Sequence, residues 1–148
     1  MIKKQNIITA IFLVLGLNLN AQEEYGTFNK EIAIGIGEDS IAVYALIAAG
    51  NENKETVILL HGLPGNERNL DLAQDLRAEG KNVIYFNYRG AWGSQGKFLY
   101  SNCLEDVSHV LDYLSDSSNI AHLHIDTSKF VLFGHSLGAG IALISGAK

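Results

Sequence analysis

The sequence predicts an α/β fold in which a mostly parallel sheet carries helices on both faces. Two apolar runs without alternation, 56–60 and 83–86, are typical of strands that are covered on both sides. Segments with apolar residues at helical spacing separate such runs. A third apolar run, 129–133, leads through a glycine-rich turn into another helix-forming segment. Strands that alternate with helices in this way indicate one α/β domain.

A β-hairpin is predicted to precede the parallel strands. Residues 28–36 alternate imperfectly between apolar and polar, and residues 41–49 are largely apolar. Between them, Gly37-Glu38-Asp39-Ser40 has the composition of a turn.

The first helix is predicted over 66–79, between the strands at 56–60 and 82–87. Asn66 is placed to cap its N-terminus, and Gly80 is placed to end it. Its apolar face consists of Leu70, Ala73 and Leu76.

The second helix is predicted after residue 101, with Asn102 and Glu105 as a capping pair. Its apolar face consists of Val107, Val110, Leu111 and Leu114. Residues 122–126 then contain two histidines and an aspartate at alternate positions, His122, His124 and Asp126. We interpret this segment as a loop leading into the next strand, because no further ligand completes a zinc site nearby.

The turn after the strand at 129–133 contains the candidate nucleophile, Ser136. Gly134 and Gly138 flank it two positions away, where side chains would collide in a sharp strand-to-helix turn. The turn holds the Ser136 hydroxyl at the end of the sheet and beside a helix N-terminus, where the Leu137 N–H can face a developing oxyanion. We expect Ala139 and Gly140 to let the following helix pack close to the sheet, as the resemblance described next implies.

With this pattern the chain resembles the α/β-hydrolase fold superfamily, whose nucleophile elbow reads G-x-S-x-G after a strand. A second matching segment is the loop His61-Gly62-Leu63-Pro64. The resemblance implies that the backbone N–H groups of Leu63 and Leu137 form the oxyanion hole. It also implies that His61 supports this loop and is not the catalytic base.

The loop Tyr88-Arg89-Gly90 resembles one that follows the fourth strand in many hydrolases of this superfamily, displaced here by Trp92. We expect it to border the active site and assign it no chemistry. Together with the loop at 61–65, it gives a resemblance to secreted bacterial hydrolases of the serine-aminopeptidase and prolyl-oligopeptidase-related kind.

The segment after Ser136 departs from the superfamily pattern, which places the triad acid and histidine after the nucleophile. Residues 137–148 contain no aspartate, glutamate or histidine. We therefore expect a domain over 22–148 that is incomplete on its C-terminal side, with an exposed sheet edge and little activity as it stands. The substrate implied is an ester, amide or thioester, carried by a small molecule or a peptide.

The first residues are predicted to be a secretory signal peptide. Lys3 and Lys4 precede an apolar run over 7–17, and Ala21 precedes a polar stretch. We place cleavage after Ala21 and expect a secreted or periplasmic protein. The alternative is an uncleaved membrane anchor, for which the apolar run is short.

Composition excludes several other functions. The formal net charge is −5, or −7 without the two lysines of the signal segment, and no basic cluster occurs, so we expect no nucleic-acid partner. We also expect no cofactor and no metal. Cys103, the only cysteine, is expected to be a small buried or half-buried residue. The sequence does not specify an oligomeric state.

Two alternatives to an enzyme remain open at this stage. One is a binding protein that keeps the hydrolase fold without its chemistry. The other is a nucleotide-binding domain that uses the glycine-rich turn at Gly134, although the Lys-Ser/Thr pair of a phosphate-binding loop is absent.

Overall fold

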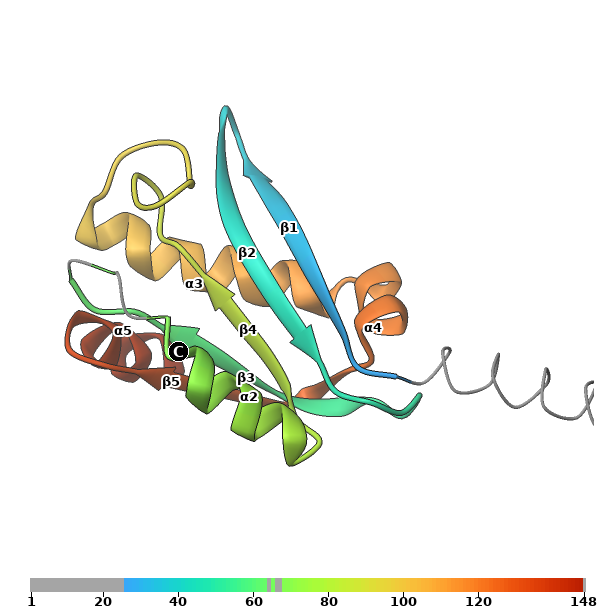
Figure 1. Cartoon of the computed structure of the whole chain (residues 1–148). Coiled ribbons are helices and arrows are strands. Elements are labelled where there is room, and N and C mark those ends of the chain that lie inside the picture. The colour runs from blue at the N-terminus through green and yellow to red at the C-terminus, as the bar shows by residue number, and fades with distance from the viewer. Residues whose placement is uncertain (1–25, 64, 66–67, 148) are drawn as a thin grey trace, which may run out of the picture.

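The computed structural model describes residues 26–63, 65 and 68–147. These residues form a five-stranded sheet in the order β1-β2-β4-β3-β5, with helices on both faces (Figure 1). The strands are β1 (Phe28–Ile36), β2 (Asp39–Ile47), β3 (Lys54–Leu60), β4 (Asn82–Phe86) and β5 (Ile125–Gly134). The predicted fold class and the predicted hairpin are confirmed.

The sheet is mixed, and its pairing brings three strand ends together. β1, β2 and β4 pair antiparallel, whereas β3 pairs parallel with both β4 and β5. The carboxyl ends of β3, β4 and β5 therefore lie at one edge of the sheet, where open α/β sheets place their sites. β5 is the last strand in the order, and its Val131 and Phe133 are exposed.

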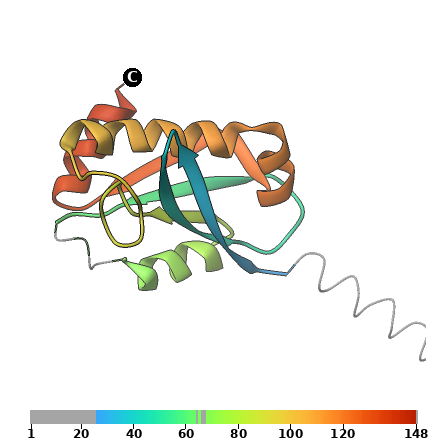
Figure 2. The same cartoon turned by 90° about the horizontal axis from the view of Figure 1, so that it is seen from above.

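The helices are α2 (Leu70–Ala78), α3 (Tyr100–Ser115), α4 (Ser117–Leu123) and α5 (Leu137–Gly146). Figure 2 shows α2, in green, on one side of the sheet and the orange and red α3, α4 and α5 on the other. Each side has its own core, because successive residues of a strand point to opposite faces. On the α2 side, Leu46, Val57, Leu59, Ala73, Val83 and Tyr85 are buried together. The core on the other side is larger and includes Ile58, Ile84, Phe86, Val107, Val110 and Ile141.

The start of α2 differs from the prediction. The helix begins at Leu70, and the residue before it, Asn69, has φ 46° and makes no side-chain capping hydrogen bond. The predicted cap Asn66 lies outside the described residues. The predicted end is confirmed, because Gly80 follows the helix with φ 82° and its N–H donates to the Arg77 carbonyl.

The predicted capping pair of α3 is wrong. The helix begins at Tyr100, so Asn102 and Glu105 lie within its first two turns. Asn102 Nδ2 donates to the Lys97 carbonyl at 3.0 Å, and Glu105 accepts from Arg89. Both side chains are engaged by the preceding loop and not by the helix terminus.

The loop predicted over 122–126 is also wrong. His122 lies in α4, His124 ends that helix with φ 53°, and Asp126 lies in β5. Asp116 starts the extra helix by accepting a hydrogen bond from Ser118 N at 2.9 Å. Burial of Leu123 and Ile125 fixes the helix and the strand start, and this packing overrides the polar composition.

The predicted signal peptide, residues 1–21, lies outside the described residues. In the described part of the chain, no helix has the length and apolar content needed to cross a membrane.

Candidate active site

Ser136 occupies a strained turn between β5 and α5. β5 ends at Gly134 and α5 begins at Leu137, so two residues connect the strand to the helix. Ser136 has φ 55° and ψ −119°, a combination that costs energy for any residue with a side chain. Its side chain is exposed to solvent. The turn therefore presents the hydroxyl at the carboxyl edge of the sheet.

Close backbone contacts explain the two glycines that flank this turn. A Cβ atom at Gly134 would lie 2.2 Å from the Gly138 carbonyl oxygen. One at Gly138 would lie 2.0 Å from the Leu60 carbonyl oxygen, at the end of β3. Both distances are shorter than any real Cβ contact, so the turn needs glycine at both positions.

Gly140 does not have the packing role expected from the sequence. A Cβ atom there would meet only Tyr100 Oη, at 3.9 Å, which is an ordinary contact. The close approach of α5 to the sheet occurs one half-turn earlier, at Gly138.

The loop after β3 lies directly against the turn. A Cβ atom at Gly62 would be 3.0 Å from Ser136 Cβ and 3.1 Å from the His135 carbonyl oxygen. The N–H of His135 also donates to the Leu60 carbonyl at 3.3 Å. Leu63 follows Gly62 and is 60% exposed. Leu137 is the first residue of α5, where backbone N–H groups have no partner within the helix.

His61 is buried at the start of this loop. Its Nδ1 lies 2.7 Å from the Gly62 carbonyl oxygen, a geometry in which the ring nitrogen donates. Its ring packs on Tyr88, with centroids 4.4 Å apart. Burial lowers the pKa of His61, which keeps the imidazole neutral. Through Nδ1 the ring supports the loop backbone, while its buried Nε2 has no hydrogen-bond partner among the residues that the structure describes.

Residues 55–148 match the family model of the alpha/beta hydrolase fold. The chain belongs to this family. Membership separates it from the nucleotide-binding domains that the glycine-rich turn also allowed.

Several hydrolase-like proteins are similar to this family member. A serine hydrolase-like protein of Dictyostelium discoideum is 28% identical over 120 residues, which are 80% of this chain and 32% of that protein. The alpha/beta hydrolase domain-containing protein WAV2 of Arabidopsis thaliana is 35% identical over 63 residues, 43% of this chain and 19% of WAV2. An alpha-beta serine hydrolase homologue from Coxiella burnetii superimposes with a TM-score of 0.61 at 27% identity, covering 76% of this chain and 54% of that one. The chain thus spans about half the length of this solved structure and less of the two curated relatives.

In this hydrolase-fold chain the loop after β4 is held by the Arg89 clamp, an ion cluster of buried Arg89 and Asp106 with the exposed Glu105. The backbone N–H of Arg89 donates to Asp106 Oδ2 at 2.8 Å, and its Nε donates to Asp106 Oδ1 at 2.5 Å. A terminal guanidinium nitrogen donates to Glu105 Oε2 at 2.8 Å. Burial raises the pKa of Asp106, and the hydrogen bonds from Arg89 oppose that rise.

Asp106 was not predicted from the sequence, although a signal was present. Asp106 is fully buried on α3 in line with Cys103, Val107 and Val110. An acid inside the apolar stripe of a helix calls for a cationic partner, since buried charges are paired. Arg89, the arginine in the loop after β4, is that partner.

Trp92 extends the same loop toward the candidate site. Its carbonyl accepts a hydrogen bond from Asn87 Nδ2 at 2.8 Å. Trp92 Nε1 lies 2.9 Å from the point where a Cβ atom at Gly65 would stand. The loop after β4 therefore borders the loop after β3 at Gly65.

Cys103 is buried, as predicted, and burial raises the pKa of its thiol to about 11. A thiol with such a pKa is a poor nucleophile at neutral pH. Within residues 26–63, 65 and 68–147, no three His, Cys, Asp or Glu side chains converge in a way that could hold a metal ion.

Proposed function

We propose that this chain is the nucleophile-bearing part of a serine hydrolase that acts on an ester, amide or thioester through an acyl-enzyme. The observation that carries the proposal is the position of Ser136, exposed at a positive φ between β5 and α5 and packed against the loop after β3. A hydroxyl so placed can attack a carbonyl carbon while the carbonyl oxygen approaches backbone amides.

Leu63 and Leu137 are proposed as the oxyanion donors. Leu137 supplies a first-turn N–H of α5, where the helix dipole also favours negative charge. Leu63 lies next to Gly62, which contacts Ser136. Each backbone donor would stabilise the tetrahedral intermediate by about 3 kcal/mol relative to its absence.

Proton transfer from Ser136 requires a histidine and an acid, which this family places after the nucleophile. Leu137–Lys148 contains no aspartate, glutamate or histidine. His61 uses Nδ1 to hold the Gly62 carbonyl, and its ring is buried. Without a base the hydroxyl stays protonated, and losing the histidine of a serine hydrolase costs on the order of a millionfold in turnover. We therefore propose slow turnover for the 148 residues alone.

The cellular location and the hydrolase subfamily are also proposals. The signal-like N-terminus supports a secreted or periplasmic protein. The loops at 61–65 and 88–96 support a relationship to serine-aminopeptidase and prolyl-oligopeptidase-related hydrolases, acting on small molecules or peptides.

An active-site-directed phosphonate tests the proposal. The protein made from its natural gene is treated with an alkyl fluorophosphonate, and peptide masses locate the adduct. We expect one adduct on Ser136, and none in Ser136→Ala. A folded protein that gives no adduct on Ser136 would contradict the proposal and favour a non-catalytic binding protein, the alternative that the missing acid and base support.

A further inference from the structure

A pocket of about 620 Å³ lies on the α2 side of the sheet, over β1, β2 and β4. α2 packs on β4 and part of β2, and the hairpin of β1 and β2 extends beyond this helix (Figure 1). Tyr44, Tyr85 and Trp92 give the pocket an aromatic lining, and Leu70 of α2 completes one side. Its volume is within the range of small-molecule sites in proteins.

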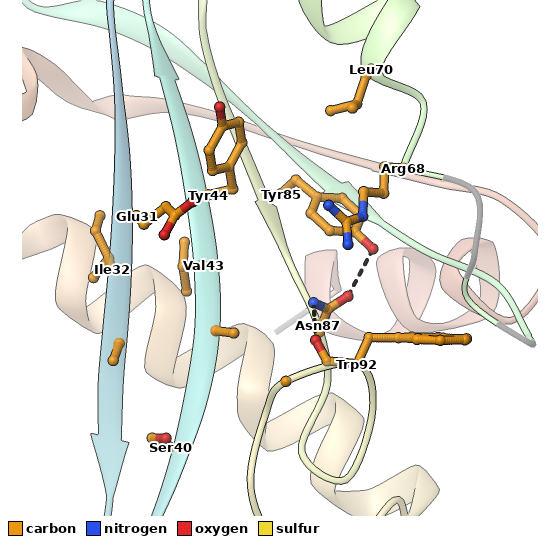
Figure 3. A pocket seen from close by; sticks show the side chains of 13 residues that line it. Glu31, Ile32, Ser40, Val43, Tyr44, Arg68, Leu70, Tyr85, Asn87 and Trp92 are labelled. Carbon is orange, nitrogen blue, oxygen red and sulfur yellow. Dashed lines mark hydrogen bonds between the residues drawn. The ribbon is translucent and has the colours of Figure 1, made fainter.

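Two opposite charges, Glu31 and Arg68, line this pocket. Glu31 projects from β1 opposite Tyr44, and Arg68 comes from the segment before α2. Figure 3 shows the Arg68 guanidinium in front of the Tyr85 ring, whereas Glu31 lies on the other side, beyond Tyr44. Neither side chain forms an ion pair or hydrogen bond with the residues that the structure describes. Arg68 does act electrostatically on the Tyr85 phenol, which places its positive charge at the aromatic wall.

The wall beside Arg68 is already hydrogen-bonded. Tyr85 Oη donates to Asn87 Oδ1 at 2.8 Å, and Asn87 Nδ2 donates to the Trp92 carbonyl at 2.8 Å, as the dashed lines in Figure 3 show. Tyr85 is buried, and that burial raises the pKa of its phenol and keeps it neutral. The aromatic wall is thus fixed, which leaves Arg68 and Glu31 as the charged groups that select a ligand.

We propose that this pocket binds a small zwitterion with an apolar middle, such as a short free peptide. The ligand carboxylate pairs with Arg68, whose planar guanidinium matches a carboxylate in two parallel hydrogen bonds. The ligand ammonium pairs with Glu31, and apolar side chains pack on Tyr44 and Tyr85. A plain carboxylate fits less well, because Glu31 would repel it. This site goes beyond the proposed function and does not depend on Ser136.

Trp92 provides a direct readout, because it is the only tryptophan of the chain and lines the pocket. Its fluorescence is titrated with leucylphenylalanine, with the N-acetylated dipeptide and with the dipeptide amide. The free dipeptide is expected to bind about fivefold more tightly than either capped form, the size of effect that one partly exposed ion pair produces.

Two charge-neutralising variants test the carboxylate end and the ammonium end of the ligand separately. Arg68→Gln should abolish the preference over the amide and keep the preference over the acetylated form. Glu31→Gln should do the reverse. Arg77→Gln and Glu38→Gln, which remove equal charges outside the pocket, should behave as wild type.

Three results would overturn the proposal. One is equal binding of all three dipeptide forms by the wild-type chain. Another is unchanged preferences in both pocket variants. The third is full affinity for the acetylated form with dependence on Arg68 alone, which would make the ligand a simple carboxylate. The phosphonate reaction of Ser136 is read separately, so failure of either proposal leaves the other testable.

Discussion

Two turns at the carboxyl edge of the sheet are built in opposite ways. The turn at Ser136, after β5, is held by backbone packed against backbone, with Gly134 and Gly138 at the contacts. The loop after β4 is held by side chains, above all by the Arg89 clamp. The first arrangement tolerates no added atom, whereas the second depends on a balance of charge.

The difference matters for the candidate chemistry. A backbone-packed turn fixes the position of Ser136 through steric contacts of Gly134 and Gly138, as the candidate nucleophile requires. The clamped loop needs its polar groups for its own support. The turn at Ser136 is therefore suited to hold a nucleophile, and the loop after β4 is suited to shape the surface around it.

The largest expected effect is that of Gly138→Ala. Its Cβ atom would stand 2.0 Å from a backbone oxygen that is part of β3 and cannot rotate away. We expect a loss of more than about 3 kcal/mol in the free energy of unfolding, above the usual range for overpacking. Urea denaturation measures it. Gly140→Ala, two residues along the same helix, is the matched control and should gain up to about 1 kcal/mol from helix propensity. Equal losses of unfolding free energy in both variants would contradict the steric explanation of this turn.

Asp106→Ala is expected to be next. It leaves Arg89 largely buried with Glu105 and the Asn102 carbonyl as its remaining partners, and breaking a buried pair costs about 3 kcal/mol or more. Glu105→Gln is its control, since the Glu105 side chain is 60% exposed and such pairs contribute about 1 kcal/mol or less. If the two variants unfold at the same urea concentration, the clamp does not hold the loop through Asp106.

A smaller, pH-dependent effect is expected from His61. Burial lowers the pKa of His61 in the folded chain, so below about pH 6.5 the unfolded chain binds more protons. The contribution of His61 to stability is therefore complete above that pH and is lost as the pH falls toward the folded pKa. His61→Asn keeps a donor for Gly62 and does not titrate. The variant should lose less stability than wild type between pH 7.5 and pH 5. Parallel stability curves would show that His61 titrates alike in both states.

The glycine-based turn could be predicted from sequence because its determinants are local. Gly134, Ser136 and Gly138 lie within five residues, after an apolar strand, and the steric reason for both glycines holds in the structure. The hairpin and the strands were predictable for the same reason, since alternation and apolar runs are local patterns.

The clamp and α4 could not be predicted in the same way. Arg89 and Asp106 are 17 residues apart, and only the packing of α3 on the sheet brings them together. α4 forms because Leu123 and Ile125 are buried, although the polar residues around them indicate a loop. In both cases tertiary contacts decided what local composition did not.

A crystal structure of the protein with a phosphonate bound to Ser136 tests the central claim most directly. The account predicts that the phosphonyl oxygen lies about 2.7–3.1 Å from the backbone nitrogens of both Leu63 and Leu137. A phosphonyl oxygen that points away from these two amides, or a Ser136 that has left its positive φ, would contradict the account.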